Sequence, residues 1–319
     1  MKKLISCCII LLLLLASICP TGAQDKPLRM AYLQNDIHHL ALWVALEKGL
    51  FPEEVNLEIA GVFKAGPEIM SAFAAGALDM AYVGSAPTTV AVANKAADVA
   101  IVSQVNTEGS ALVVHQDSSL QEINDLQGTT LAVPGHSTVQ DFLLRRALKA
   151  HGLEMQDVNS IVIKPPEMIS ALRSKQIDAF IAWEPYPAKA HTMGVGRNLA
   201  TSSDIWPEHP CCVLVVNRKY LQEHPQRVSA IVRTHMRGTR FIEDNPLEAV
   251  RIGTKYTGMD EETVEQALLT VHYTPQLSVE GELEYVRFLN ELGYIQVDDP
   301  ELFVQELMHS QLLDKILCK

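Results

Sequence analysis

An internal repeat limits the folds open to this chain more than any other feature of its sequence. Residues 69–87 align without a gap on residues 168–186, at an offset of 99 positions. In each copy a helical segment is followed by an apolar residue and an aspartate, then by a short apolar run and a proline-containing helix start. The repeat indicates that one supersecondary unit occurs twice in the fold.

Strand and helix patterns alternate along the first two thirds of the chain. Strands are predicted at residues 28–33, 57–59, 78–83, 99–105, 111–114, 130–133, 161–164, 178–183 and 212–216. Helices are predicted between them at 38–48, 67–75, 87–96, 139–150, 167–174 and 186–193, and then at 225–244, 247–256, 261–269, 280–292 and 300–313. This alternation predicts an α/β fold with largely parallel sheets covered by helices.

Two similar α/β units in one chain suggest two lobes that face each other. Ligands of open parallel sheets sit beyond the carboxyl ends of the strands, so two facing edges would form a cleft. The predicted boundaries assign residues 24–112 and 214–319 to lobe 1 and residues 113–213 to lobe 2. The crossings between the lobes are expected near residues 111–118 and 209–216.

The first 23 residues have the pattern of a secretory signal peptide. Lys2 and Lys3 precede an apolar run over residues 4–18, and Ala23 ends a short segment of small residues. The pattern predicts export, with cleavage after Ala23. An uncleaved anchor and a lipid tether on Cys19 are alternatives, but the apolar run is short for a membrane span of roughly 20 residues.

Charge and cysteine content narrow the function classes for the exported chain. The formal net charge of the full chain is −12, and removal of Lys2 and Lys3 makes it −14. An acidic balance argues against nucleic acid as a partner. Three cysteines follow the cleavage site: Cys211, Cys212 and Cys318. An odd number does not indicate a disulfide framework, and the adjacent pair is interpreted as buried strand residues.

Several short motifs give the chain a family resemblance over roughly residues 28–246. The segments are residues 47–51 (EKGLF), 76–87 (GALDMAYVGSAP), 125–128 (DLQG) leading to 137–138 (ST), 183–186 (WEPY) and 209–217 (HPCCVLVVN). In this order and spacing, they resemble the nitrate/taurine/alkanesulfonate-type substrate-binding proteins of ABC transporters.

The resemblance implies a type II periplasmic-binding-protein fold, with two α/β lobes, a two-strand hinge and a ligand cleft. It also implies an extracytoplasmic protein that passes a small solute to an ABC permease in the membrane. A monomer without a cofactor is expected. Enzymes of pyrimidine or menaquinone synthesis share this scaffold and are one alternative. The predicted signal peptide argues against it, because those enzymes are cytosolic. A ligand-sensing ectodomain is another.

Two predicted helix starts carry hydroxyl groups suited to an anion. Ser85 and Ala86 lie in the turn before the helix that contains Pro87, and Ser137 and Thr138 precede the helix from residue 139. Free backbone N–H groups and the helix dipole favour an anionic group at such places. The plainer interpretation is that these side chains only cap their helices.

Other predicted ligand contacts follow the first strand and the later strands. Gln34 and His38 come after the first strand, and Thr107 lies near the first crossing. Trp183 ends a strand and can cover one face of a ligand, while Glu184 can hold an amine. The plainer interpretations are that Trp183 is a core residue, that Glu184 is solvated and that Thr107 only belongs to a turn. A ligand with at least one anionic group is expected, and Glu184 leaves room for a zwitterion.

Catalytic and metal-binding motifs are not found. The chain has no G-x-S-x-G, no P-loop and no dinucleotide fingerprint in a strand-to-helix context. His38 and His39 are adjacent, but no third ligand stands at a recognisable spacing. The sequence therefore predicts a binding protein rather than an enzyme, with no metal site.

Overall fold

The repeat predicted from the sequence is present in the three-dimensional structure, a computed structural model that describes residues 26–53 and 55–317. Helices α2 (Gly66–Ala74) and α5 (Pro165–Arg173) begin 99 positions apart, as do strands β3 (Met80–Gly84) and β8 (Ala179–Trp183). Even the hydrogen bonds repeat. The Asp79 carboxylate accepts from the backbone N–H of Arg29, and the Asp178 carboxylate accepts from that of Thr130. Each aspartate therefore ties its strand to the first strand of its unit.

The first lobe is built on a six-stranded mixed sheet with the order β11-β4-β10-β3-β1-β2. Strands β1, β2 and β3 are parallel, and β10 runs antiparallel between β3 and β4. The strands not yet given are β1 (Leu28–Leu33), β2 (Leu57–Phe63), β4 (Val99–Glu108), β10 (Pro210–Asn217) and β11 (Val271–Tyr273). Because β10 is reversed, its beginning lies at the edge where the parallel strands end.

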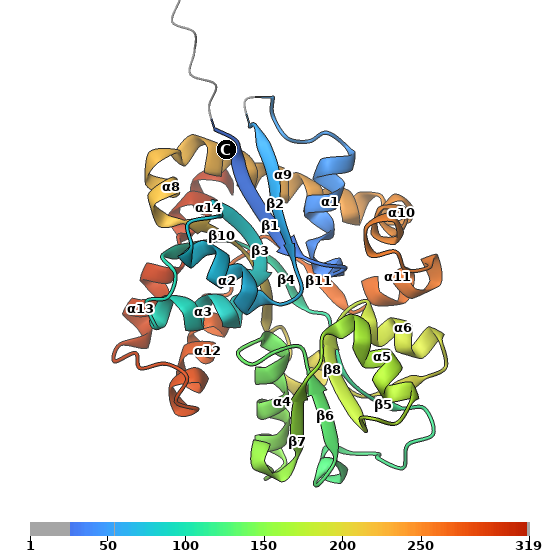
Figure 1. Ribbon diagram of the computed structural model, residues 1–319. Helices are drawn as coiled ribbons and strands as arrows, with labels where there is room; N and C mark the ends of the chain where they lie inside the picture. Colours follow the sequence, from blue (N-terminus) through green and yellow to red (C-terminus); the bar gives the residue numbers. More distant parts are fainter. Residues whose placement is uncertain (1–25, 54, 318–319) are drawn as a thin grey trace, which may run out of the picture.

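The second lobe is built on a five-stranded sheet with the order β7-β6-β8-β5-β9. Its other strands are β5 (Ser110–His115), β6 (Thr130–Val133), β7 (Asn159–Val162) and β9 (Gly196–Thr201). The sheet and its helices form the lower body in Figure 1. Two α/β lobes joined by extended strands confirm the predicted fold class.

Helices cover both sheets, and the last third of the chain is almost wholly helical. The longer helices are α1 (Leu40–Glu47), α3 (Ser85–Ala93), α4 (Val139–Ala150), α6 (Tyr186–Thr192), α8 (Arg218–Glu223), α9 (Pro225–Asp244), α10 (Pro246–Thr257), α11 (Glu261–Leu268), α12 (Val279–Glu291), α13 (Pro300–Leu307) and α14 (Ser310–Leu317). Helix α7 (Ser202–Ile205) is a single turn. Helices α9 to α14 return to lobe 1, as the red and orange ribbons of Figure 1 show.

Several local predictions differ from the structure. Residues 300–313 form two helices rather than one, because Met308 has an extended backbone and bridges to Ile101 of β4. The strands β9 and β11 were not predicted, because β9 is only partly buried and β11 has three residues. Short edge strands of this kind carry little periodic signal.

The chain crosses between the lobes at two places. The first is Gly109, which alone separates β4 of one sheet from β5 of the other. The second lies between Ile205, where α7 ends, and Pro210, where β10 begins. Sheet membership thus places Ser110 in lobe 2 and Cys212 in lobe 1, a few residues from the predicted boundaries.

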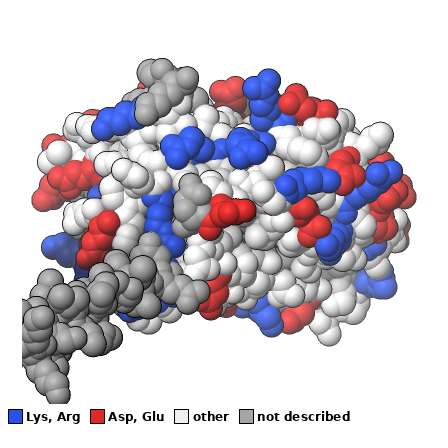
Figure 2. Space-filling view, turned by 90° about the horizontal axis from the view of Figure 1, so that it is seen from above, with Lys and Arg blue, Asp and Glu red and all other residues white. Residues whose placement is uncertain are grey.

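The ends and the surface of the chain bear on export and partners. The predicted signal peptide and Cys318 lie outside the described residues. Within the described part, no helix is long and apolar enough to cross a membrane. On the face seen in Figure 2, acidic and basic side chains are interspersed among uncharged ones.

Candidate functional site

A small cavity lies between the lobes and is lined from both. Its volume is about 20 Å³. The lining residues of lobe 1 are Leu33, Asp36, His38, Gly66, Gly84, Pro87, Cys211 and Cys212, and those of lobe 2 are Thr138, Val139, Gln140 and Trp183. The residues follow the ends of β1, β3, β6 and β8, as predicted for a ligand site in such sheets. The cavity has room for about one water-sized group.

His38 lines the cavity and makes contacts with several of its other residues. It lies in a short 3₁₀ helix, residues Ile37–His39, directly after β1, and the Asp36 carboxylate caps this helix by accepting from the His38 backbone N–H. The imidazole Nε2 lies 2.9 Å from the carbonyl oxygen of Gly109, at the crossing between the lobes. His38 is fully buried, so its ring orientation is set by these contacts.

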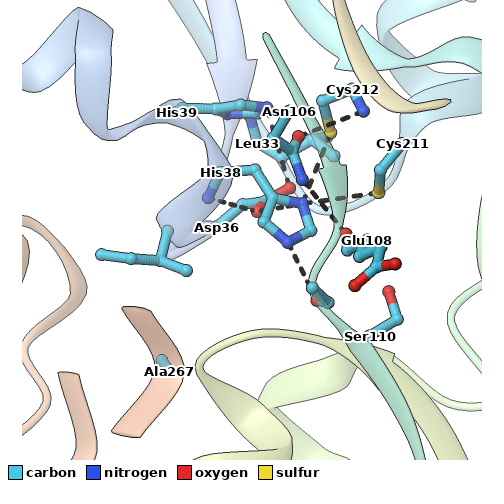
Figure 3. Close-up of polar contacts among 12 residues, drawn as sticks. Leu33, Asp36, His38, His39, Asn106, Glu108, Ser110, Cys211, Cys212 and Ala267 are labelled. Atoms are coloured by element: carbon cyan, nitrogen blue, oxygen red, sulfur yellow. Dashed lines mark hydrogen bonds and ion pairs between the residues drawn. The ribbon is translucent and has the colours of Figure 1, made fainter. Parts of the chain in front are cut away.

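Cys211 and Cys212 reach the same histidine although they are neighbours on a strand. Their Sγ atoms each lie 3.6 Å from His38 Nδ1 (Figure 3). Successive strand residues normally point to opposite faces of a sheet. Here the pairing of β10 with β4 shifts register on both sides of Cys212, and Cys211 has no partner on β4. A bulge of this kind re-aims a side chain, so both sulfur atoms face the cleft.

The buried ionisable groups of this cluster shift one another's pKa values. Burial opposes protonation of His38, but Asp36 and the Cys211 sulfur outweigh it and raise the pKa of His38 to about 9. A hydrogen bond from Cys212 and the charge of His38 lower the pKa of the Cys211 thiol despite its burial. The buried cluster therefore favours a thiolate at Cys211 facing an imidazolium at His38.

The hydroxyl groups of Ser85 and Thr138, at the two predicted helix starts, already have hydrogen-bond partners within the protein. The Ser85 hydroxyl donates to Glu282, which also accepts from the hydroxyl of Thr89 one turn further along α3. Burial raises the pKa of Glu282, and these two donors oppose the rise. At the start of α4, the Thr138 hydroxyl caps the helix by accepting from the backbone N–H of Asp141.

Trp183 and Glu184 end β8 and differ in what they offer the cavity. Trp183 lines it, and its buried Nε1–H has no hydrogen-bond partner among the described residues. Glu184 is turned away from the cavity: its carboxylate accepts from the backbone N–H of Ala188 and lies 3.5 Å from the hydroxyl of Thr270. Burial raises the pKa of Glu184 to about 7.

The structure brings together only some of the predicted contact residues. His38, Thr138 and Trp183 line the cavity. The predicted residues that do not line it are Gln34, Ser85, Ala86, Thr107, Ser137 and Glu184. Their roles in ligand binding stay predictions, since a solute that parts the lobes would meet a wider surface.

Sequence reasoning missed four cavity residues with polar or sulfur-bearing side chains: Asp36, Gln140, Cys211 and Cys212. Asp36 and Gln140 lie within or beside segments that were considered, at positions that no motif marks. The cysteines were correctly interpreted as buried strand residues. The bulge that turns both toward His38 has no sequence signature, because it depends on pairing with β4.

Among the described residues, four ion pairs bridge the two lobes. In each, the basic residue belongs to lobe 2 and the acidic residue to lobe 1. The pairs are Arg146–Glu284, Lys149–Glu291, Lys164–Glu68 and Lys189–Asp260. This one-sided arrangement means that the rims of the two lobes attract each other.

A larger hollow of about 740 Å³ lies elsewhere and belongs to lobe 1 alone. Arg29 and Arg227 are among its lining residues, and Arg29 is already paired with Asp79 at 2.7 Å. It does not touch the cleft or the crossings. The small cavity is therefore the stronger candidate, because residues from both lobes converge on it.

A cavity between two α/β lobes, at the carboxyl ends of their strands and next to a hinge, defines the class of two-lobed solute-binding proteins. Comparison with known proteins agrees with this class. Residues 21–252 match the model of the NMT1-like family, and the chain belongs to that family. The resemblance noted in the sequence motifs is thereby confirmed.

Individual relatives extend over most of the chain. A binding protein of Brucella abortus is 30% identical over 246 residues, which cover 76% of this chain and 75% of the relative. An aliphatic sulfonates-binding protein of Bacillus subtilis is 27% identical over 278 residues, which cover 84% and 82%. The periplasmic nitrate-binding protein NrtA from Synechocystis has the same fold, with a TM-score of 0.80 at 14% identity over 92% of this chain and 88% of that one.

Proposed function

We propose that this protein is the exported solute-binding component of an ABC importer and that its solute is small, with at least one anionic group. The observation that carries the proposal is the cavity lined by both lobes beside the crossing at Gly109. A solute that contacts both lobes stabilises the closed form over the open form. A membrane permease would then recognise the closed form.

The relatives support the proposed solute class. One is named for aliphatic sulfonates and another for nitrate. The unpaired indole N–H of Trp183 offers a donor for an anionic oxygen at the cavity wall. None of the cavity-lining residues is a lysine or an arginine, so the imidazolium of His38 is the side-chain cation that the cavity lining offers an anion.

The remaining expectations are part of the same proposal. Residues 1–23 direct export, and the protein acts as a monomer outside the cytoplasm. Interspersed surface charges and a net charge of −12 do not suit nucleic acid. The named relatives are binding proteins, which supports a function without catalysis.

A thermal-shift screen of the protein from residue 24 onward tests the proposal. Nitrate, taurine and short alkanesulfonates are the probes. A solute present at 100 times its Kd stabilises the folded state by about 2.7 kcal/mol. Trp183→Phe removes the indole N–H and keeps an aromatic ring, so it should weaken binding of the solute that stabilises the wild-type protein.

A second tryptophan provides the matched control. Trp43 is buried in α1, stacks on Tyr256 and lies outside the cavity lining. Trp43→Phe should therefore leave solute affinity unchanged even if it lowers stability. A screen in which no probe stabilises the protein, or turnover of any probe by the purified protein, would contradict the proposal.

A further inference from the structure

Three potential metal ligands converge at one point in the cavity floor. The Sγ atoms of Cys211 and Cys212 both lie 3.6 Å from Nδ1 of His38, and the three ligand atoms lie within 4.8 Å of one another. All three side chains are at least 97% buried. Both cysteines are free rather than joined in a disulfide.

The hydrogen bond on the far side of the imidazole prepares it as a ligand. A carbonyl oxygen can only accept, so the 2.9 Å contact between His38 Nε2 and the Gly109 oxygen requires a proton on Nε2. Nδ1 is then the nitrogen that loses its proton when the ring binds a cation, and its lone pair faces the two sulfur atoms. Metal-bound histidines are commonly fixed in this way by a backbone carbonyl.

The spacing of the ligand atoms matches a tetrahedral ion. Zinc binds sulfur at about 2.3 Å and imidazole nitrogen at about 2.0–2.1 Å, and a tetrahedral angle then separates nitrogen from sulfur by about 3.6 Å. Both nitrogen–sulfur distances in the cluster are 3.6 Å. Asp36 Oδ1 lies 3.2 Å from the same nitrogen and borders the site.

Hydrogen bonding by His38 explains only part of the cluster. The single Nδ1–H of the imidazolium can point at one sulfur atom at a time, yet both sulfur atoms lie 3.6 Å from Nδ1. The strand bulge nevertheless turns both cysteines toward it, instead of leaving one on the opposite face of the sheet. A cation at the point where the three atoms meet would satisfy both sulfur atoms and the nitrogen together.

We propose that His38, Cys211 and Cys212 bind a thiophilic transition-metal ion, with Zn²⁺ as the representative, in the floor of the cleft. Histidine and cysteine are the ligands that Zn²⁺ prefers, and it binds them deprotonated. With Cys211 already a thiolate and His38 an imidazolium, its entry releases two protons, one from the Cys212 thiol and one from Nδ1. Three protein ligands leave a fourth position open, next to a cavity of about 20 Å³. An anionic group of a solute fits that position, which deepens the proposed function, although the metal site itself does not rest on it.

The test uses the reduced protein from residue 24 onward, with Zn²⁺ and with Co²⁺ as a spectroscopic probe. We expect one ion per chain and a thiolate-to-cobalt charge-transfer band. Cys211→Ser and Cys212→Ser should each weaken Zn²⁺ binding by more than about 100-fold, beyond the loss typical of an outer-shell partner. Cys318→Ser is the matched control, and it should leave binding and the band unchanged.

X-ray absorption of the zinc-loaded wild-type protein keeps the test decisive if a serine variant fails to fold. It should show two sulfur neighbours at about 2.3 Å and nitrogen at about 2.0–2.1 Å. The proposal is overturned if reduced protein binds no stoichiometric Zn²⁺, or if the band persists when both cysteines are replaced. A disulfide between Cys211 and Cys212 that returns after reduction, even with Zn²⁺ present, also overturns it.

The metal site and the proposed function can fail separately. Stabilisation of chelator-treated protein by nitrate, taurine or an alkanesulfonate, without Zn²⁺ binding, would leave the function standing and remove the metal site. Zn²⁺ binding through both cysteines, with no stabilisation of the zinc-loaded or the chelator-treated protein by any anionic probe, would leave the metal site standing and contradict the proposed function.

Discussion

Gly109 is a position at which a methyl group would disturb both the crossing between the lobes and the site. Its φ is +81°, a left-handed conformation that costs an L-residue roughly 1–2 kcal/mol. A Cβ at this position would lie 2.4 Å from His38 Nε2 and 2.8 Å from Val271 Cγ2. His38 is fully buried and bonded to the Gly109 carbonyl, so it cannot move aside freely.

We therefore expect Gly109→Ala to cost roughly 2–5 kcal/mol, the sum of the backbone term and about 1–3 kcal/mol for overpacking. Gly128→Ala is the matched control. Gly128 has a φ of +75°, but nothing lies within 4 Å of an added Cβ, so only the backbone term of roughly 1–2 kcal/mol applies.

Urea unfolding followed by both tryptophan fluorescence and circular dichroism measures the difference. Coincident transitions would support two-state behaviour, and an unchanged slope would show that the midpoint reports stability. Equal losses in the two variants would refute the reasoning, because they would mean that His38 is not held against Gly109.

Two further predictions concern Glu184 and the rim of the cleft. Burial raises the pKa of Glu184 in the folded protein from 4.5 to about 7. The contribution of its protonated carboxyl group to folding stability is therefore complete below about pH 4.5 and is lost as the pH rises toward 7. Glu184→Gln should match the wild type in urea unfolding near pH 4 and exceed its stability by up to about 3 kcal/mol at pH 8, whereas a constant difference would contradict the assigned pKa. Lys189→Glu places like charges across the rim at Asp260 and should favour the open form by about 1 kcal/mol, seen as a larger radius of gyration in X-ray scattering. Arg240→Glu, which breaks a pair within α9, is its control, and equal scattering from both variants would count against a rim that holds the lobes together.

The prediction of the fold from sequence succeeded where the signal was local and repeated. Residues 69–87 and 168–186 carry the same helix, aspartate and strand, and each aspartate makes the same backbone contact in the structure. Periodicity and turn residues are enough to predict such units. They were not enough for β11, because three residues become a strand only when β4 lies beside them.

The site was predictable only in part, for a related reason. Strand ends marked by His38, Thr138 and Trp183 do line the cavity, since the carboxyl edge of a sheet is set by topology. Ser85 and Glu184 also lie at helix starts, but their side chains are bonded to Glu282 and Ala188. Helix α12, which carries Glu282, begins almost 200 residues after Ser85, and no pattern in the sequence predicts the hydrogen bond between these two residues.

The sequence by itself determined that two α/β units alternate and repeat, and that their strand ends face a cleft, because these features follow from hydrophobic periodicity and chain order. Only the tertiary structure decided what fills the floor of that cleft. A register shift between β10 and β4 turns Cys211 and Cys212 to the same side, and the crossing at Gly109 sets the ring of His38 against them. The first depends on the pairing of Cys212 with Asn106 of β4, and the second on a contact between residues 71 positions apart. The order of residues along one strand encodes neither of these non-local contacts.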